Sequence, residues 1–204
     1  MHNELVTLLN SKANGCDATT AEVECGDQPI FVEAAHINAS LKALKESTYE
    51  FNVLQLITGC DFEDRIEISY ILASFTKNHE VIIKTKLAKP SSDAILDIDS
   101  VCDLWLAAGF LERETYDMFG VRFNGNPDLR RILCPDDWEG WPLRKDYVVQ
   151  EKYKHMLVNP QNKINTDDLY FFDRQKKEAA EPKLWSGSWK KPEFPAEVEA
   201  KGEK

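Results

Sequence analysis

Two neighbouring stretches of alternating apolar and polar residues constrain the fold of this chain more than any other feature. In residues 65–72, and again in residues 80–88, apolar side chains recur at every second position. Such alternation is typical of strands that are covered on one face only. Residues 76–79 between the two stretches are long enough only for a short turn, so we expect an antiparallel hairpin.

Other segments supply further strands and two helices. A third strand is expected at residues 51–58, with Leu54 and Leu56 on the same face. A fourth is expected at residues 29–34. Apolar residues at helical spacing predict helices over two ranges, residues 3–11 and residues 37–47.

A longer helix is expected after the hairpin. An apolar stripe from Val101 to Tyr116 predicts about 19 helical residues. Ser100 and Asp103 resemble a capping box at its start, and Gly120 suits its C-terminal cap. Helices on one face of an antiparallel sheet make an α+β fold. Residues 89–97 are interpreted as a connection, and no regular period continues beyond Gly120.

These patterns divide the chain into three parts. Residues 1–120 form the predicted α+β domain, and residues 121–150 are a turn-rich docking motif. Residues 151–204 are an extended, irregular C-terminal segment, in which Trp185, Trp189 and Phe194 are candidate anchors on neighbouring subunits. A tail without a fixed structure, with incidental aromatic residues, is the alternative.

Charge and hydropathy exclude several classes of partner. The formal net charge is −10 and the pI is about 5.0, which disfavours nucleic acid because phosphate binding needs a basic face. No apolar stretch approaches the roughly 20 residues that cross a bilayer. The N-terminal residues do not resemble a signal peptide. We therefore expect a cytoplasmic chain that reaches a membrane only through other proteins.

Residues 112–147, called the docking segment below, carry the densest chemistry in the chain. Eight acidic and six basic side chains lie there among aromatic residues, glycines and prolines. So much charge cannot be buried unpaired, and so many aromatic side chains are rarely left bare in water. The segment is therefore predicted to be a contact surface that meets complementary groups on another chain.

The same segment contains candidates for catalysis. Glu112, Glu114 and Asp117 could act as acid and base in a free-standing hydrolase. Glu112 and Glu114 do not converge on a helix, however, and Arg113 can pair with Asp117 four residues later. A charged helix end is the favoured interpretation. Arg130, Arg131, Arg144 and Asp146 are expected to form buried ion pairs between subunits, because no phosphate-binding glycine motif accompanies the arginines.

Cysteine and histidine give no metal signature. The five cysteines, at positions 16, 25, 60, 102 and 134, form no CxxC motif, and the four histidines are dispersed. Reduced thiols in a cytosolic protein are the expected state.

Six short pieces of the docking segment, in order, resemble the 30 kDa subunit of respiratory complex I, also called the C-type subunit of NADH:quinone oxidoreductase. They are Glu112-Arg113-Glu114, Tyr116-Asp117, Phe119-Gly120, Pro127-Asp128-Leu129-Arg130-Arg131-Ile132-Leu133, Pro135-Asp136-Asp137-Trp138-Glu139-Gly140 and Pro142-Leu143-Arg144-Lys145-Asp146-Tyr147. The order of strands and helices upstream also fits, so the resemblance covers residues 28–150.

The resemblance implies a cofactor-free, non-catalytic subunit of the peripheral arm, on the cytoplasmic face of a bacterial inner membrane. Its implied partners are the D-type and B-type subunits of complex I, with FMN and iron–sulfur clusters held by other subunits. The matching subunit of a ferredoxin-driven or plastoquinone-linked complex, or of a membrane-bound hydrogenase, is the alternative. The candidate interface residues are Glu112, Arg113, Glu114, Asp117, Asp128, Arg130, Arg131, Asp136, Asp137, Trp138, Glu139, Trp141, Arg144, Lys145, Asp146, Tyr147, Trp185 and Trp189.

Two positions depart from the family pattern. The family usually has His after the glycine in both GHP pieces, and this chain has Asn126 and Trp141 there. A proton or quinone role that needs His is therefore not expected at these positions. Asn126 can still donate and accept hydrogen bonds, and Trp141 offers apolar contact area.

Overall fold

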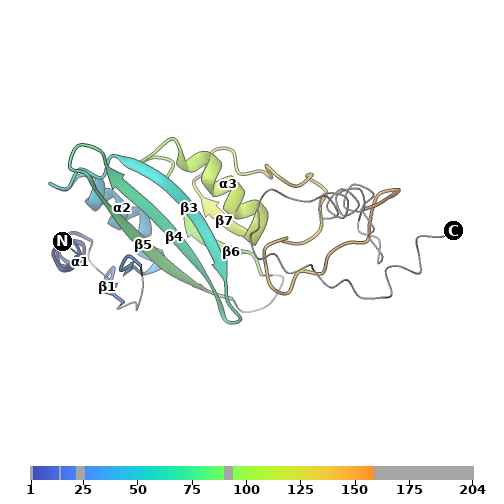
Figure 1. The fold of residues 1–204 in the computed structure, drawn as a ribbon, viewed down its shortest axis with the longest axis horizontal. Coiled ribbons are helices and arrows are strands. Elements are labelled where there is room, and N and C mark those ends of the chain that lie inside the picture. The colour runs from blue at the N-terminus through green and yellow to red at the C-terminus, as the bar shows by residue number, and fades with distance from the viewer. Residues whose placement is uncertain (1, 14, 22–25, 90–93, 159–204) are drawn as a thin grey trace, which may run out of the picture. The chain divides into compact units, whose positions relative to one another are not determined.

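The computed structural model describes residues 2–13, 15–21, 26–89 and 94–158, which belong to two compact units, residues 1–149 and residues 150–204 (Figure 1). The elements of the first unit are α1 (His2–Lys12), β1 (Thr19–Thr20), β2 (Ile30–Phe31), the 3-10 helix η1 (Ala34–His36), α2 (Ile37–Lys45), β3 (Val53–Asp61), β4 (Arg65–Ser74), β5 (His79–Ala88), β6 (Leu96–Asp99), α3 (Ala108–Phe119) and β7 (Val121–Asn124). In the second unit, β8 (Lys152–Tyr153) and β9 (Met156–Leu157) pair antiparallel.

A five-stranded sheet with the order β1-β2-β5-β4-β3 forms the centre of the first unit. The predicted hairpin is confirmed, because β4 and β5 pair antiparallel along ten residues. β3 adds antiparallel to β4, whereas β2 adds parallel to β5. β2 and β5 can run parallel because the chain between them is long and includes η1, α2, β3 and β4. The strand expected at residues 29–34 is shorter than predicted because the chain turns into η1.

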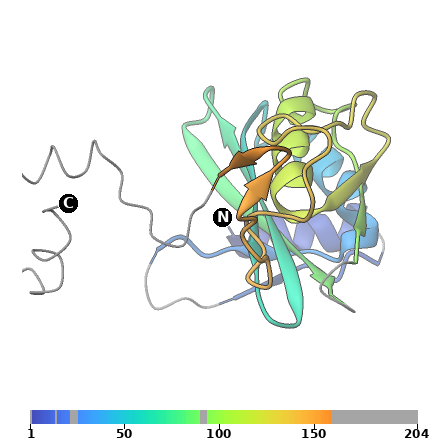
Figure 2. The same ribbon diagram turned by 90° about the vertical axis from the view of Figure 1, so that its right-hand side faces the viewer.

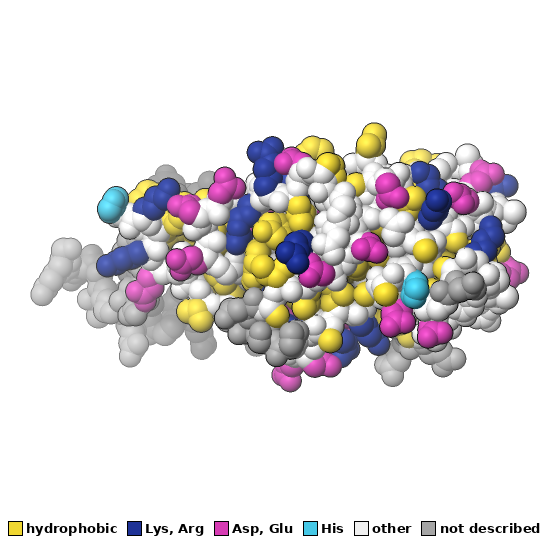
Figure 3. Space-filling model, turned by 180° about the vertical axis from the view of Figure 1, so that it is seen from behind, with side chains coloured by type: hydrophobic (Ala, Val, Ile, Leu, Met, Phe, Trp, Pro, Cys, Tyr) yellow, Lys and Arg dark blue, Asp and Glu magenta, His cyan; other side chains and the backbone are white. Residues whose placement is uncertain are grey.

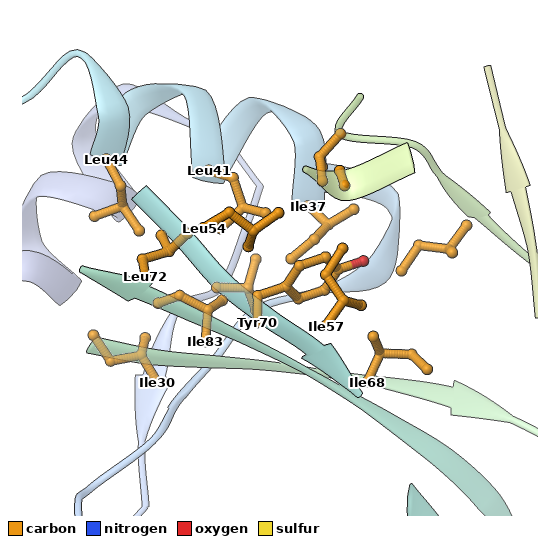
Figure 4. Packing of buried hydrophobic residues seen from close by; sticks show 14 of the residues in the cluster. Ile30, Ile37, Leu41, Leu44, Leu54, Ile57, Ile68, Tyr70, Leu72 and Ile83 are labelled. Carbon is orange, nitrogen blue, oxygen red and sulfur yellow. The ribbon is translucent and has the colours of Figure 1, made fainter. Parts of the chain in front are cut away.

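Helices cover one face of this sheet, which confirms the predicted α+β class (Figure 2). The expected helices at residues 3–11 and 37–47 are α1 and α2. Ile37, Leu41 and Leu44 of α2 are fully buried and point at the inner side chains of the strands (Figure 4). Each such side chain removed from water contributes about 1.5–3 kcal/mol, so this layer is a main source of stability.

The face assignment within β3 is wrong at one residue. The register of β3 against β4 shifts between Leu54 and Leu56, which is a β-bulge. Leu54 therefore points into the core, while the side chain of Leu56 is 37% exposed on the other face. The extra residue breaks the strict alternation that predicted a shared face.

The long helix is shorter than predicted. α3 begins at Ala108, and residues 101–107 form turns. The Oγ of Ser100 accepts a hydrogen bond from the backbone N–H of Cys102 at 3.1 Å, so it caps a local turn rather than the helix. Gly120 ends α3 in the left-handed conformation, with φ of 69°, as predicted.

α3 connects two short parallel strands that the sequence interpretation missed. β6 begins in the expected connection, residues 89–97, and β7 lies beyond Gly120. The two strands pair from Leu96↔Val121 to Asp99↔Asn124. Alternate side chains of both strands are buried, but a period of two over only four residues is a weak signal. α3 also packs on β3, where Phe119 approaches Gly59 too closely for a Cβ to fit.

Candidate functional site

The docking segment begins on α3, includes β7 and then continues as turns. Four polar side chains of the first unit that hold this segment are buried: Glu112 and Asp117 are 0% exposed, Arg144 is 4% and Asp61 is 5%. Buried charges are tolerated only when they are paired and hydrogen-bonded. The partners of these four groups therefore define how the segment is held.

Asp117, near the end of α3, is the centre of the first anchor. Its Oδ2 accepts hydrogen bonds from three consecutive backbone N–H groups, those of Ile132 at 3.1 Å, Leu133 at 2.7 Å and Cys134 at 2.8 Å. Its Oδ1 accepts a hydrogen bond from Arg131 at 2.7 Å. The guanidinium of Arg131 also donates to the carbonyls of Trp138 and Gly140, both at 3.0 Å. One carboxylate thus fixes residues 131–134 directly and residues 138–140 through Arg131.

The pKa of Asp117 reflects this arrangement. Burial opposes the charged form, but the N–H donors of Cys134, Leu133 and Ile132, together with Arg131, outweigh it and hold the pKa below its ordinary value. The same burial, with the negative charge of Asp117 nearby, raises the pKa of the Cys134 thiol. The anchor therefore works as a carboxylate at neutral pH.

Glu112, one and a half turns earlier on α3, is the centre of the second anchor. Its carboxylate accepts hydrogen bonds from Ser100 Oγ at 2.8 Å and from the backbone N–H of Val101 at 2.8 Å. Asn126 Nδ2 donates to it at 2.8 Å, and Asn126 Oδ1 accepts from the backbone N–H of Asp128 at 2.9 Å. Asn126 therefore ties the turn after β7 to α3.

Cys102 completes the Glu112 cluster. Its Sγ donates to Glu112 Oε2 at 3.3 Å. Burial, together with the charge of Glu112, raises the pKa of the Cys102 thiol to about 11, although a hydrogen bond with Ser100 opposes the shift. The thiol is therefore protonated at neutral pH.

Trp141 and Arg144 close the far end of the segment. Arg144 Nε donates to the carbonyl of Phe119 and its Nη2 to that of Ala94, both at 2.6 Å. The indole of Trp141 lies against the backbone of Gly120 so closely that a Cβ there would overlap it. Trp141 also meets Tyr116 edge-on, with ring centroids 5.4 Å apart, and the guanidinium of Arg131 lies 4.7 Å from its ring centroid.

Asp61, at the end of β3, binds the last turn of the docking segment through the backbone of Lys145. Its carboxylate accepts from Lys89 Nζ at 3.1 Å and from the backbone N–H of Lys145 at 2.8 Å. Lys89 Nζ also lies 3.7 Å from Asp146. Sequence reasoning missed Asp61, because Lys145 is 84 residues away in the chain and no local pattern connects the two.

Several predicted contacts within the segment differ from the observed ones. Arg113 does not pair with Asp117, which is already saturated by the turn at residues 131–134. It instead donates to the carbonyls of Arg130 at 3.1 Å and Arg131 at 3.2 Å, and lies 3.6 Å from Asp128. Arg131 and Arg144 both bind groups of this chain, and their expected pairs with another subunit stay a prediction.

The remaining predicted interface residues line the surface of the segment. Arg130 pairs with Asp128 at 2.9 Å, and Trp138 Nε1 donates to the Tyr147 hydroxyl at 3.1 Å. The exposed residues of the set are Glu114, Asp128, Arg130, Asp136, Asp137, Glu139, Lys145 and Asp146. Trp185 and Trp189 lie outside the described residues. An interface role for the whole set stays a prediction.

This geometry is that of an anchored surface rather than an open catalytic centre. The carboxylates of Glu112 and Asp117 are enclosed, and each has four donors around it, so neither faces solvent as a hydrolase base would. Within the described ranges, no three His, Cys, Asp or Glu side chains gather as a metal site. The helices of the described part of the chain include none that is long and apolar enough to span a membrane.

Apolar side chains also reach the surface of the first unit. Phe110, Leu133 and Leu143 are 65%, 64% and 55% exposed, and Ile132 is 40% exposed. On the side opposite to that of Figure 1, apolar side chains gather in a broad area beside basic and acidic ones (Figure 3). Mixed surfaces of this kind are common at sites of protein association.

Comparison with known proteins gives a consistent match. Residues 30–153 match the family model described as the 30 kDa subunit of respiratory-chain NADH dehydrogenase. The C-type subunit of NADH-quinone oxidoreductase from Chloroherpeton thalassium is 43% identical over 116 residues, which are 56% of this chain and 47% of that protein. The C/D-type subunit from Acidiphilium cryptum is 33% identical over 155 residues, which are 70% of this chain and 26% of that protein. The chain thus spans about half, or less, of the length of these relatives.

Among solved structures, the chain resembles one in the structure of the membrane-bound sulfane sulfur reductase, an archaeal respiratory membrane complex. The TM-score is 0.58 at 25% sequence identity, and the match covers 95% of this chain and 98% of that chain.

Proposed function

The chain belongs to the family of the 30 kDa subunit of respiratory-chain NADH dehydrogenase, and on that premise we propose that it is part of a proton-translocating NADH:quinone oxidoreductase. In this proposal the complex passes electrons from NADH through FMN and iron–sulfur clusters to quinone. Those cofactors are held by other subunits, and this chain is a non-catalytic part of the peripheral arm. It lies on the cytoplasmic face of a bacterial inner membrane and reaches the membrane only through the complex.

The way in which the docking segment is held is the observation that carries a scaffolding role. Asp117, Glu112 and Arg144 use their charges to fix turns of this chain, and the exposed side chains of the segment are presented on that fixed frame. Preorganised surfaces bind with a smaller entropic cost, because little ordering is left to be done on association. The frame therefore suits a subunit whose task is to hold neighbours in place.

The D-type subunit is the first partner in this proposal. In Acidiphilium cryptum the matching region belongs to a protein whose name joins C and D. A region joined to D in one polypeptide is held near D at a high effective concentration, which favours a direct contact between the two parts. The B-type subunit is the second proposed partner, on the basis of the family resemblance alone.

A second candidate function is the equivalent subunit of a membrane-bound complex that does not use NADH. The likeness to a chain of the membrane-bound sulfane sulfur reductase favours it, since that match spans nearly the whole of both chains. The alternative keeps the scaffolding role and changes the electron donor. Purifying the intact complex and assaying NADH oxidation against reduction of a quinone separates the two candidates.

An affinity-tagged chain recovered from a detergent extract of membranes tests the scaffolding role. We expect the wild-type chain to recover a large complex that contains a D-type subunit, and Arg144→Ala to reduce that recovery together with quinone-linked activity. Removing Arg144 takes its donors away from the carbonyls of Phe119 and Ala94, and the loss of such enclosed contacts costs on the order of several kcal/mol. The control is Lys77→Ala, which breaks an exposed pair with Glu50 outside the docking segment and should leave recovery unchanged.

Two results would count against the proposal. A wild-type chain that is recovered alone, as a soluble monomer, would exclude a role in a complex. An Arg144→Ala variant that assembles normally and has lost turnover would assign the segment to catalysis instead.

A further inference from the structure

The turn at Ile132 and Leu133 presents apolar side chains from a backbone that is held by hydrogen bonds to Asp117. The N–H groups of Ile132, Leu133 and Cys134 all point to Asp117 Oδ2, at 2.7–3.1 Å. The side chain of Ile132 is 40% exposed and that of Leu133 is 64% exposed. Exposed aliphatic side chains are ordinary, but here a buried, fully paired carboxylate fixes the backbone that displays them.

The turn is also held from its carbonyl side. Arg113 donates to the carbonyls of Arg130 and Arg131, the two residues that precede Ile132. The guanidinium of Arg113 lies 5.8 Å from the ring centroid of Phe110, which is itself 65% exposed. α3 therefore binds both the donors and the acceptors of the turn, and places an exposed apolar ring beside the arginine that does so.

We propose that Ile132 and Leu133 insert into an apolar recess on the D-type subunit of the complex. This inference rests on the proposed function and names the contact that the docking segment makes. The D-type subunit is chosen because a relative carries the matching region and D in one chain. A rigid tip that fills a pocket loses little conformational entropy on binding, and such central apolar anchors dominate the energy of interfaces.

The matched control comes from the same chain. Phe75, in the turn between β4 and β5, is 74% exposed and is held by none of these anchors. The test compares the full-length tagged chain carrying Ile132→Ser with Leu133→Ser against the chain carrying Phe75→Ser, each purified with its complex from detergent extract. Serine at either site removes apolar surface from an already exposed position, so both variants are expected to fold like the wild type.

We expect the double variant to recover at least about tenfold less D-type subunit than the wild type, and Phe75→Ser to recover the wild-type amount. If the double variant recovers as much D-type subunit as the wild type, the proposed contact of Ile132 and Leu133 is overturned, while the proposed function is left intact. Equal loss by Phe75→Ser would also overturn it. Failure of the wild-type chain to recover any D-type subunit would overturn the proposed function itself.

Photo-crosslinking gives a readout that does not depend on the stability of the variants. A benzophenone amino acid replaces Leu133 in one chain and Phe75 in another, and the assembled complex is irradiated. A crosslink from position 133 to the D-type subunit, without one from position 75, supports the proposal. A crosslink from position 133 only to another subunit, or none at all, overturns it.

Discussion

Replacing Asp117 by asparagine removes the charge of the first anchor and keeps its size. The carboxylate of Asp117 is 0% exposed, and it accepts one bond from Arg131 and three from backbone N–H groups. An amide at this place leaves the guanidinium of Arg131 without a counter-charge. In either orientation, the NH₂ group of the amide also faces N–H donors where a carboxylate oxygen accepted hydrogen bonds. Breaking a buried ion pair by removing one partner costs about 3–5 kcal/mol, so we expect Asp117→Asn to lower the free energy of unfolding by that amount.

Urea unfolding followed by tryptophan fluorescence measures this loss, since Trp138 and Trp141 both lie in the segment that Asp117 holds. The matched control is Asp128→Asn, because Asp128 pairs with Arg130 on the surface, with exposed fractions of 57% and 69%. That change should cost less than about 1 kcal/mol. Equal losses for the two variants would refute the assignment of Asp117 as the principal anchor.

The pH dependence supplies a second test. The pKa of Asp117 is lower in the folded chain than in the unfolded chain. Its contribution to the free energy of unfolding is therefore fully present above the ordinary carboxyl pKa of about 3.9, and it is lost as the pH falls through the lower pKa of the folded chain. The difference between wild type and Asp117→Asn should therefore be constant from about pH 5 to pH 8 and should shrink below about pH 4. A difference that grows toward acid would contradict the depressed pKa.

Three further changes test the other contacts of the segment. Gly120→Ala adds a side chain to a residue in the left-handed conformation, with φ of 69°, and places it against the indole of Trp141. We expect the free energy of unfolding in urea to fall by more than about 1–2 kcal/mol. A change below about 0.5 kcal/mol would contradict the close packing. Asn126→Asp places a second carboxylate where Asn126 Nδ2 now lies, 2.8 Å from the carboxylate of Glu112. Because the two negative charges repel, the thermal midpoint of unfolding should fall relative to the wild type at pH 7 and recover toward pH 4. An unchanged midpoint at pH 7 would show that Asn126 is not needed as a hydrogen-bond donor. The pKa of the Cys102 thiol is about 11, and only the thiolate reacts with an alkylating reagent. The rate of Cys102 alkylation, followed by mass spectrometry, should therefore rise about tenfold per pH unit between pH 8 and pH 10. A rate that levels off near pH 8 would refute the raised pKa.

The sequence predicted the sheet and most of its cover because those patterns are long. Ten-residue strands β4 and β5 carry enough alternation to fix their faces, and α2 shows a clear apolar stripe. β6 and β7 were missed because four residues carry little periodic signal. The bulge at Leu54 and Leu56 was missed because only pairing with β4 shows the extra residue.

The candidate site divides in the same way. The density of charge marked residues 112–147 as the part of the chain with special chemistry, but the partners were assigned by proximity in sequence. Arg113 was paired with Asp117 four residues away, whereas the fold gives Asp117 to Arg131 and to the turn that follows it. The sequence assigned this charge to contacts with another chain, and it did not reveal the partners that Asp117, Glu112 and Arg144 have within this chain.

The contact between Asp61 and Lys145 has a consequence for the order of events in the cell. It joins residues 84 apart, and that between Arg144 and Ala94 joins residues 50 apart, so the docking segment closes through contacts of high sequence separation. Contacts of high sequence separation are slow to form, because the entropy cost of loop closure must be met before they add stability. A newly made chain would then complete its docking segment only after its sheet is complete.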